Sequence, residues 1–198
     1  MSNEPCILIV PGLRDAVAEH WQTLLEMRLR AARRQVAVVQ PMGRADLDCA
    51  ARVAAIEQQA QAVQGPLVVV AHSAGCIMVA HWAQQTRCVV AGALLAAPPD
   101  FDAPLPAGYP TLAALQAGGW LPVPRCRLPF RSIVAASRND ELGRFERIAA
   151  LAGAWGSRLD DLGRVGHLNP ASGFGTWPQA NDYIDELCAG DAAHRRAA

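Results

Sequence analysis

Short apolar runs alternate with amphipathic segments along almost the whole chain. Runs of strand length, rich in branched residues, predict buried strands; they span residues 6–10, 35–39, 67–71, 89–97 and 132–136, with a weaker sixth run at 158–162. Segments with helical spacing or with residues typical of helix boundaries lie between them; they span residues 18–34, about 46–64, 74–86, 145–155 and 178–188. The pattern predicts strand–helix units repeated along one domain.

This order of elements is typical of an α/β fold. It predicts a mainly parallel sheet of about six strands with helices on both faces. Residues 100–129, which are rich in proline, are expected to form a long connection with one helical turn near 111–116, without a large cap domain. We expect the domain to span residues 1–190 and residues 191–198 to form a disordered tail. Sites in such sheets lie beyond the carboxyl ends of the strands.

Composition adds several exclusions. The 198 residues are 52% hydrophobic and 18% charged with zero formal net charge, which favours a folded domain over a disordered chain. No basic face stands out, so nucleic acid is not an expected partner. Apolar runs of strand length predict no membrane span. Residues 1–5 lack the basic and apolar regions of a signal peptide, and a cytoplasmic location is expected.

The nucleophiles and ligands that the chain offers narrow its chemistry further. The six cysteines are scattered without a C-x-x-C pair, and we expect reduced, mostly buried thiols and no metal site. The sequence contains no lysine. That absence excludes a pyridoxal-phosphate Schiff base, a Walker-A lysine and a Ser–Lys dyad. We therefore expect chemistry without a cofactor, carried by Ser, His, Asp, Glu, Cys or backbone groups.

The third predicted strand runs directly into Ala71-His72-Ser73-Ala74-Gly75. This is the nucleophile-elbow pattern G-x-S-x-G with Ala in place of the first Gly. In that pattern a tight strand-to-helix turn exposes the serine hydroxyl, and small residues on either side keep the backbone from clashing. An ordinary strand–helix turn, in which Ser and Gly are common, is the alternative. Ser73 is the candidate nucleophile.

A serine nucleophile needs a base and an acid, which follow it in the chain order Ser, acid, His in this type of site. His167 comes just after the sixth predicted strand, where the base is expected, although a lone loop histidine is often structural. Asp140 follows the fifth strand and is the candidate acid, although Asp after a strand is commonly a cap or turn residue. Glu141, and Asp100 after the fourth strand, remain rival acids.

The backbone can supply donors for a developing oxyanion. The first predicted strand ends at Pro11-Gly12-Leu13, where glycine permits a turn that directs the Leu13 N–H toward the site. The Ala74 N–H, at the start of the following helix, is the second expected donor. A plain Pro-Gly turn is the alternative interpretation of the first segment.

Several further segments together resemble the small serine-hydrolase family that includes retinoblastoma-binding protein nine and many bacterial relatives. The resemblance runs from near the start of the chain to about residue 188, and its motifs are as follows: Pro11-Gly12-Leu13, His20-Trp21, Val70 to Cys76, Ala80-His81-Trp82, Ala97 to Asp100, Leu128-Pro129-Phe130, Ala136-Ser137 with Asp140, Trp155-Gly156-Ser157, Gly166 to Asn169, and Ser172-Gly173 with Trp177-Pro178.

The resemblance implies a minimal α/β-hydrolase fold and a triad on Ser73, Asp140 and His167. It also implies hydrolysis of small esters or related acyl bonds without a cofactor. Two departures bear on the site: Glu141 stands where the family usually has Pro, and Arg14-Asp15 replaces small or polar residues. The retinoblastoma-binding motif L-x-C-x-E is not carried over, because Ala51 stands in place of its acid.

The expected function is thus that of an esterase-like serine hydrolase acting on a small-molecule acyl substrate through an acyl-Ser73 intermediate. A binding module or pseudoenzyme on the same scaffold is the alternative, and a protein partner is possible without being indicated by any motif. A nucleotide-binding doubly wound domain fits the strand pattern, but the first strand is not followed by G-x-G-x-x-G.

Overall fold

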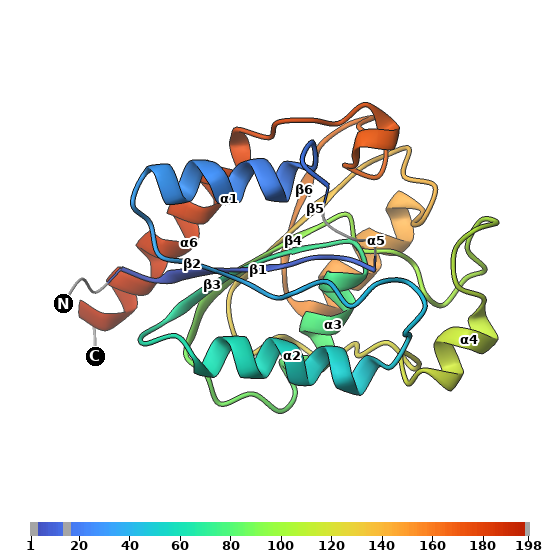
Figure 1. Cartoon of the computed structure of the whole chain (residues 1–198), viewed down its shortest axis with the longest axis horizontal. Coiled ribbons are helices and arrows are strands. Elements are labelled where there is room, and N and C mark those ends of the chain that lie inside the picture. The colour runs from blue at the N-terminus through green and yellow to red at the C-terminus, as the bar shows by residue number, and fades with distance from the viewer. Residues whose placement is uncertain (1–3, 14–16, 197–198) are drawn as a thin grey trace.

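The computed structural model describes residues 4–13 and 17–196, and it is built around a single parallel sheet. The sheet has six strands in the order β2-β1-β3-β4-β5-β6, and every neighbouring pair is parallel. The twisted sheet runs through the middle of the molecule (Figure 1). Its strands are β1 (Cys6–Val10), β2 (Val36–Val38), β3 (Leu67–His72), β4 (Val90–Ala96), β5 (Ser132–Ala136) and β6 (Arg158–Asp161).

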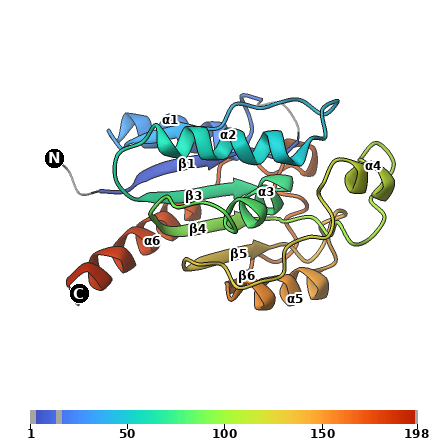
Figure 2. The same ribbon diagram turned by 90° about the horizontal axis from the view of Figure 1, so that it is seen from below.

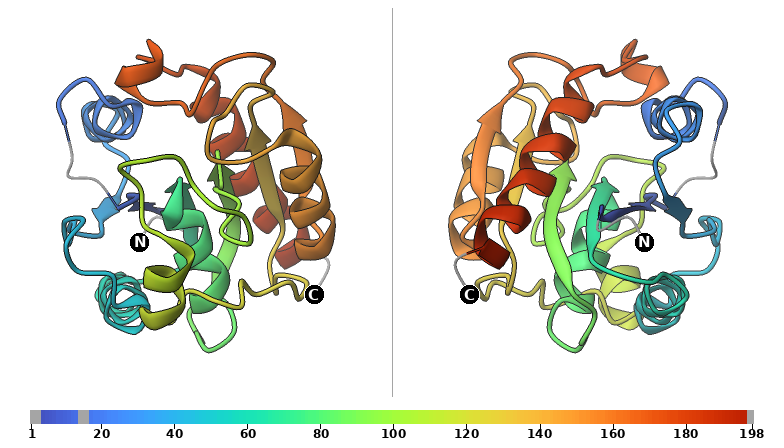
Figure 3. Two further views of the ribbon diagram at one scale, coloured as in Figure 1. Left: turned by 90° about the vertical axis from the view of Figure 1, so that its right-hand side faces the viewer. Right: turned by 90° about the vertical axis from the view of Figure 1, so that its left-hand side faces the viewer.

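Helices cover both faces of this sheet (Figures 2 and 3). Apolar side chains of α1 and α6 pack on one face, among them Leu25 and Ile184. Side chains of α2, α3 and α5 pack on the other face, among them Ile56 and Leu151. The helices are α1 (Trp21–Ala31), α2 (Cys49–Gln61), α3 (Ala74–Trp82), α4 (Leu112–Ala117), α5 (Phe145–Trp155) and α6 (Gln179–Arg196), with a 3₁₀ turn η1 (Pro170–Ser172).

The α/β architecture predicted from the sequence is confirmed, and the sheet is parallel throughout. The largest difference at the amino end concerns α1, which begins at Trp21 rather than near residue 18. His20 is its N-cap, and its side chain accepts a hydrogen bond from the Gln22 N–H at 3.2 Å. At the carboxyl end, α6 continues to Arg196, beyond the helix end expected near residue 188. None of the helices in the described part of the chain has the length and hydropathy that a bilayer crossing requires.

The long connection from residue 100 to 129 forms no separate cap domain. It contains α4, which Thr111 caps, and the fully buried Trp120. The Trp120 indole N–H donates to the carbonyl of Leu47 at 2.7 Å, and the Cys49 N–H donates to the carbonyl of Gly118 at 2.9 Å. The connection is therefore fastened to the start of α2, at the carboxyl edge of the sheet.

All six cysteines are free thiols. Cys6, Cys49 and Cys76 are buried, Cys88 and Cys188 are half-buried, and Cys126 is exposed.

Candidate active site

The turn between β3 and α3 holds Ser73 in a strained conformation. Its φ is 55° and its ψ is −131°, outside the regions that residues other than glycine normally adopt. Two glycines make this turn possible by their close approach. A Cβ on Gly75 would lie 2.7 Å from the carbonyl oxygens of both Val10 and Pro11, and a Cβ on Gly12 would lie 3.1 Å from the Cβ of Ser73. The end of β1 is thereby packed directly against the turn.

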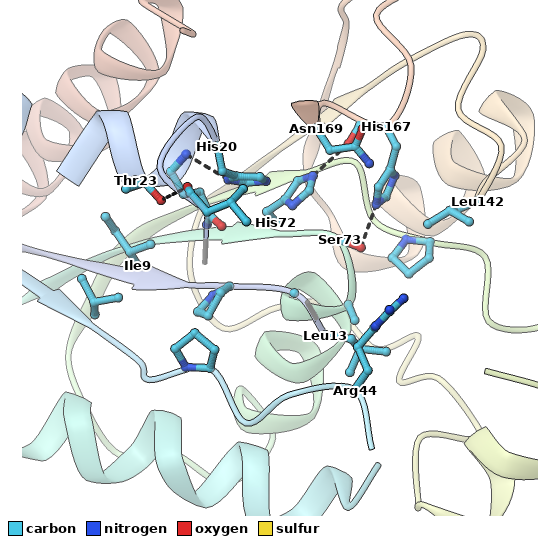
Figure 4. Close-up of a pocket in the computed structure, with 18 of the residues that line it drawn as sticks. Ile9, Leu13, His20, Thr23, Arg44, His72, Ser73, Leu142, His167 and Asn169 are labelled. Carbon is cyan, nitrogen blue, oxygen red and sulfur yellow. Dashed lines mark hydrogen bonds between the residues drawn. The ribbon is translucent and has the colours of Figure 1, made fainter. Parts of the chain in front are cut away.

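The structure brings His167 and Asp140 to the hydroxyl of Ser73. His167 Nε2 lies 2.8 Å from Ser73 Oγ, and His167 Nδ1 lies 2.7 Å from Asp140 Oδ2 (Figure 4). Both side chains are almost fully buried, with exposures of 7% for His167 and 4% for Asp140. A carboxylate can only accept at Nδ1–H, which leaves the Nε2 lone pair directed at the serine hydroxyl. This is the arrangement that nucleophile activation requires.

The loop after β5 positions both Asp140 and the segment that carries His167. The second carboxylate oxygen of Asp140 accepts from the Leu142 N–H at 2.9 Å. Asn139 Oδ1 accepts from the Gly166 N–H at 2.9 Å, so the two loops are joined next to the histidine. Gly166 has a φ of 63° and Leu168 a φ of 50°, which shows how sharply the backbone turns on either side of His167.

His72 supports His167 from behind, a role that the sequence patterns did not indicate. Its Nε2–H donates to the backbone carbonyl of His167 at 2.9 Å, and its ring lies between those of His20 and His167 at centroid distances of 4.8 and 5.0 Å. Burial, followed by the nearby His167 and His20, holds the pKa of His72 well below its ordinary value. Burial and then His167 lower the pKa of His20 to about 4. Both supporting histidines are thus neutral at neutral pH.

The rival acids are directed at other partners. Asp100, 8% exposed, forms a two-pronged ion pair with Arg147: Nη2 lies 3.0 Å from Oδ1, and Nε contacts Oδ2. Glu141 is exposed and accepts a hydrogen bond from the Tyr109 hydroxyl at 3.4 Å. Of the three candidate acids, Asp140 is therefore the one hydrogen-bonded to His167.

A cleft of about 1140 Å³ opens in front of Ser73. Leu13 and Ala74 line it beside the serine, so both predicted donor residues lie at the site, and their N–H groups remain the predicted oxyanion hole. The two residues Arg14 and Asp15 lie outside the described part of the chain. The cleft is lined mainly by apolar side chains from the loops above the sheet, including Phe101, Leu105, Pro110 and Leu142. Among the described residues, no group of three His, Cys, Asp or Glu side chains is placed to hold a metal ion.

Comparison with known proteins agrees with this geometry. A family model described as "Serine hydrolase" matches residues 7–186. The chain belongs to that family. A comparison of the serine hydrolase chain with curated protein sequences found no match. The narrower resemblance to retinoblastoma-binding protein nine stays a prediction.

Several solved structures are similar over nearly the full length of the chain. A protein described as a YdeN-like hydrolase from Pectobacterium atrosepticum is 30% identical, with a TM-score of 0.72 over 96% of this chain and 92% of its own. The ydeN gene product of B. subtilis is 19% identical, with a TM-score of 0.73 over 92% and 98%. Est1E from Butyrivibrio proteoclasticus is 12% identical, with a TM-score of 0.68 over 97% and 90%. The last two show a shared fold.

Proposed function

We propose that this serine hydrolase cleaves a small ester or related acyl bond through an acyl-Ser73 intermediate. The observation that carries the proposal is the continuous hydrogen-bonded array from Ser73 Oγ through His167 to Asp140, at 2.8 and 2.7 Å. An isolated serine hydroxyl is a weak nucleophile at neutral pH, and an adjacent oriented base is what activates it.

In the first step, Ser73 Oγ attacks the acyl carbon while His167 Nε2 accepts the hydroxyl proton. Asp140 keeps the other proton on Nδ1 and stabilises the imidazolium that forms. The negative charge that develops on the acyl oxygen is bound by the predicted donors, the N–H groups of Leu13 and Ala74. His167 then returns its proton to the leaving alcohol or amine, and the acyl group stays on Ser73.

In the second step, water attacks the acyl-Ser73 ester. His167 accepts a proton from the water molecule, a second tetrahedral species forms and collapses, and the proton passes to Ser73 Oγ as the acid product leaves. The cleft in front of Ser73 gives water access to the acyl group, and the buried Asp140 keeps the histidine in one orientation for both steps.

A binding module that has kept the array without turnover is the rival proposal. Reaction with a fluorophosphonate probe separates the two, because the probe requires an activated serine and an oxyanion site. Labelling is expected on the wild-type chain, is expected to vanish in Ser73→Ala, and is expected to drop at least tenfold in His167→Ala. Mass spectrometry of the labelled peptide locates the adduct.

The matched control is Ser157→Ala, which removes a hydroxyl bonded to Ser132 at the other end of the sheet. It should label like the wild type. If folded wild-type protein stays unlabelled beside a labelled reference serine hydrolase, the binding module is the better account. An adduct on Cys76, the buried thiol in the first turn of α3, would show that Ser73 is not the nucleophile.

A further inference from the structure

Arg44 is a charged residue of the cleft without a role in the proposed catalytic steps. Arg44 lies in the loop between β2 and α2, and its side chain extends toward the part of the cleft in front of Ser73 (Figure 4). No acid within the described residues pairs with it. Among the described residues, the second arginine that lines the cleft is Arg30, which forms an ion pair with Glu26 at 2.9 Å.

The loop that carries Arg44 is held by a buried cation. Arg52, on α2 and 3% exposed, donates from Nη2 to the carbonyl of Gly43 at 2.5 Å and to the carbonyl of Asp46. One guanidinium thus binds the backbone on both sides of Arg44. Burying an arginine costs desolvation, and here its Nε has no partner. The two hydrogen bonds to backbone carbonyls offset part of that cost and fix the loop that carries Arg44.

A second attachment holds the same loop at its other end. The carbonyl of Leu47 accepts from the buried Trp120 indole, and Asp48 caps α2 by accepting from the Ala51 N–H at 3.0 Å. The backbone around Arg44 is therefore anchored to both α2 and the long connection. An anchored backbone loses less freedom when its side chain binds an anion than an unanchored loop would.

Among the described residues that line the cleft, no charge balances Arg44. Glu26 and Arg30 cancel each other, and the low pKa values of His20 and His72 keep both rings neutral. Asp140 is covered by its hydrogen bond to His167 and does not line the cleft. Arg44 is exposed, so water solvates its charge when the cleft holds a neutral molecule. A substrate with a carboxylate would replace that water by an ion pair at the cleft.

We propose that Arg44 binds a carboxylate carried by the substrate, so that Ser73 acts on acyl compounds with an anionic group. This rests on the proposed hydrolase function and names its substrate class. The hydrocarbon part of such a substrate fits the apolar lining formed by Leu13, Leu105 and Leu142. The planar guanidinium can grip a carboxylate with two parallel hydrogen bonds, which an ammonium group cannot do.

Two pairs of esters of matched size test the proposal and locate the carboxylate. The first pair is 4-nitrophenyl butyrate and mono-4-nitrophenyl succinate, of which the succinate carries a carboxylate on the acyl side. The second pair is phenyl acetate and 4-carboxyphenyl acetate, of which the latter carries a carboxylate on the leaving group. In one pair the ratio of kcat/KM, anionic over neutral, should fall about tenfold in Arg44→Ala, mainly through KM. Arg44→Lys should lose part of that preference.

The matched control is Arg87→Ala, which removes the same charge from an exposed position outside the cleft and should leave both ratios unchanged. If Arg44→Ala and Arg87→Ala give equal ratios in both pairs while the neutral esters are hydrolysed, the proposal is overturned and the hydrolase function stands. If no ester is turned over, the proposal is tested by the rate at which the fluorophosphonate labels Ser73. Phenylacetate, which is anionic, and phenylacetamide, which is neutral, are compared as compounds that slow this labelling. Protection in the wild type that is lost in Arg44→Ala supports the proposal, and equal protection by both compounds overturns it. A chain that does not label at all overturns the proposed function itself.

Discussion

Two aspartates follow neighbouring strands at the same edge of the sheet, and their surroundings differ completely. Asp140 comes after β5 and faces His167 at 2.7 Å, whereas Asp100 comes after β4 and faces Arg147. Both are nearly buried. The same residue type at the same kind of position therefore serves a histidine in one loop and an arginine in the next, and the partner decides the chemistry that is available.

The partners differ in whether they can exchange a proton. The hydrogen bonds that Arg147 donates to Asp100, and then the negative charge of Asp100, raise the pKa of the Arg147 guanidinium. Arg147 stays protonated and holds the loop after β4 to α5. An imidazole can accept and return a proton near neutral pH. The Asp140 loop is thus suited to catalysis, and the Asp100 loop is suited to holding the cleft wall in place.

The largest expected effect tests this difference directly. Asp140→Asn should lower kcat for a neutral aryl ester by about four orders of magnitude, because an amide at that site favours the wrong tautomer of His167. Asp100→Asn should change kcat by less than about threefold and lower the melting temperature by about 2–4 °C through the weakened tie to Arg147. Steady-state kinetics and thermal unfolding of both variants measure this. Near-wild-type turnover in Asp140→Asn, together with a collapse in Asp100→Asn, would reverse the assignment.

A smaller effect on turnover is expected from changing His72, which contacts His167, the partner of Asp140. His72→Phe keeps a ring of similar size but removes the donor to the carbonyl of His167, so the base loses one of its supports. We expect kcat to fall about tenfold with KM nearly unchanged, since the support acts through the position of His167.

His72→Gln supplies a donor again and should recover part of the lost kcat. Recovery of turnover by Gln, at equal thermal stability of the two variants, is the signature of a positioning role. Equal losses of kcat in Phe and Gln variants, matched by equal losses of stability, would instead indicate that His72 contributes packing alone.

Patterns of apolar and turn residues predicted the bounds of those strands and helices whose ends are set by neighbouring residues. The bounds of β1, β5 and α5 were predicted as they are observed, because breakers or turn residues flank each run. Ser73 and His167 could be proposed as one site because strand order places them at the same edge, and the structure has them 2.8 Å apart. Asp140 was preferred as the acid, but Asp100 and Glu141 stayed rivals, because the direction of a loop side chain depends on partners that lie far away in the sequence.

The supporting residues of the site were missed for a related reason. His72 occupies the variable position of the elbow motif, and the carbonyl that it serves belongs to residue 167. Arg44 stands in a loop without periodicity, and its lack of an acidic partner within the described residues is a property of the folded chain. Nothing in the sequence distinguishes Arg52 from other helix residues, because its burial against the carbonyls of Gly43 and Asp46 depends on the folded loop.

The surroundings of Asp140 and of Asp100 also differ in how they make the stability of the fold depend on pH. His20 and His72 lie on the Asp140 side, and the pKa of each is lowered in the folded state. In the unfolded chain both take up a proton near pH 6.5. Between about pH 4 and 6.5 the unfolded state therefore binds more protons than the folded state, and stability falls as the pH falls through this window. Arg147, on the Asp100 side, does not titrate there.

The smallest expected effect follows from that difference. The substitution His20→Asn removes the titration and keeps a side-chain acceptor at the N-cap of α1. This variant should reduce the slope of the unfolding free energy against pH between about pH 4 and 6.5. The reduction is at most about 1.4 kcal/mol per pH unit, the limit for one proton. Urea unfolding at several pH values measures the slope, and Asp100→Asn is the control, because it removes a group whose arginine partner stays charged throughout. If His20→Asn and Asp100→Asn leave equal slopes, His20 is not held neutral by its burial next to His72, and the histidine side of the cleft is more open to water than its contacts indicate.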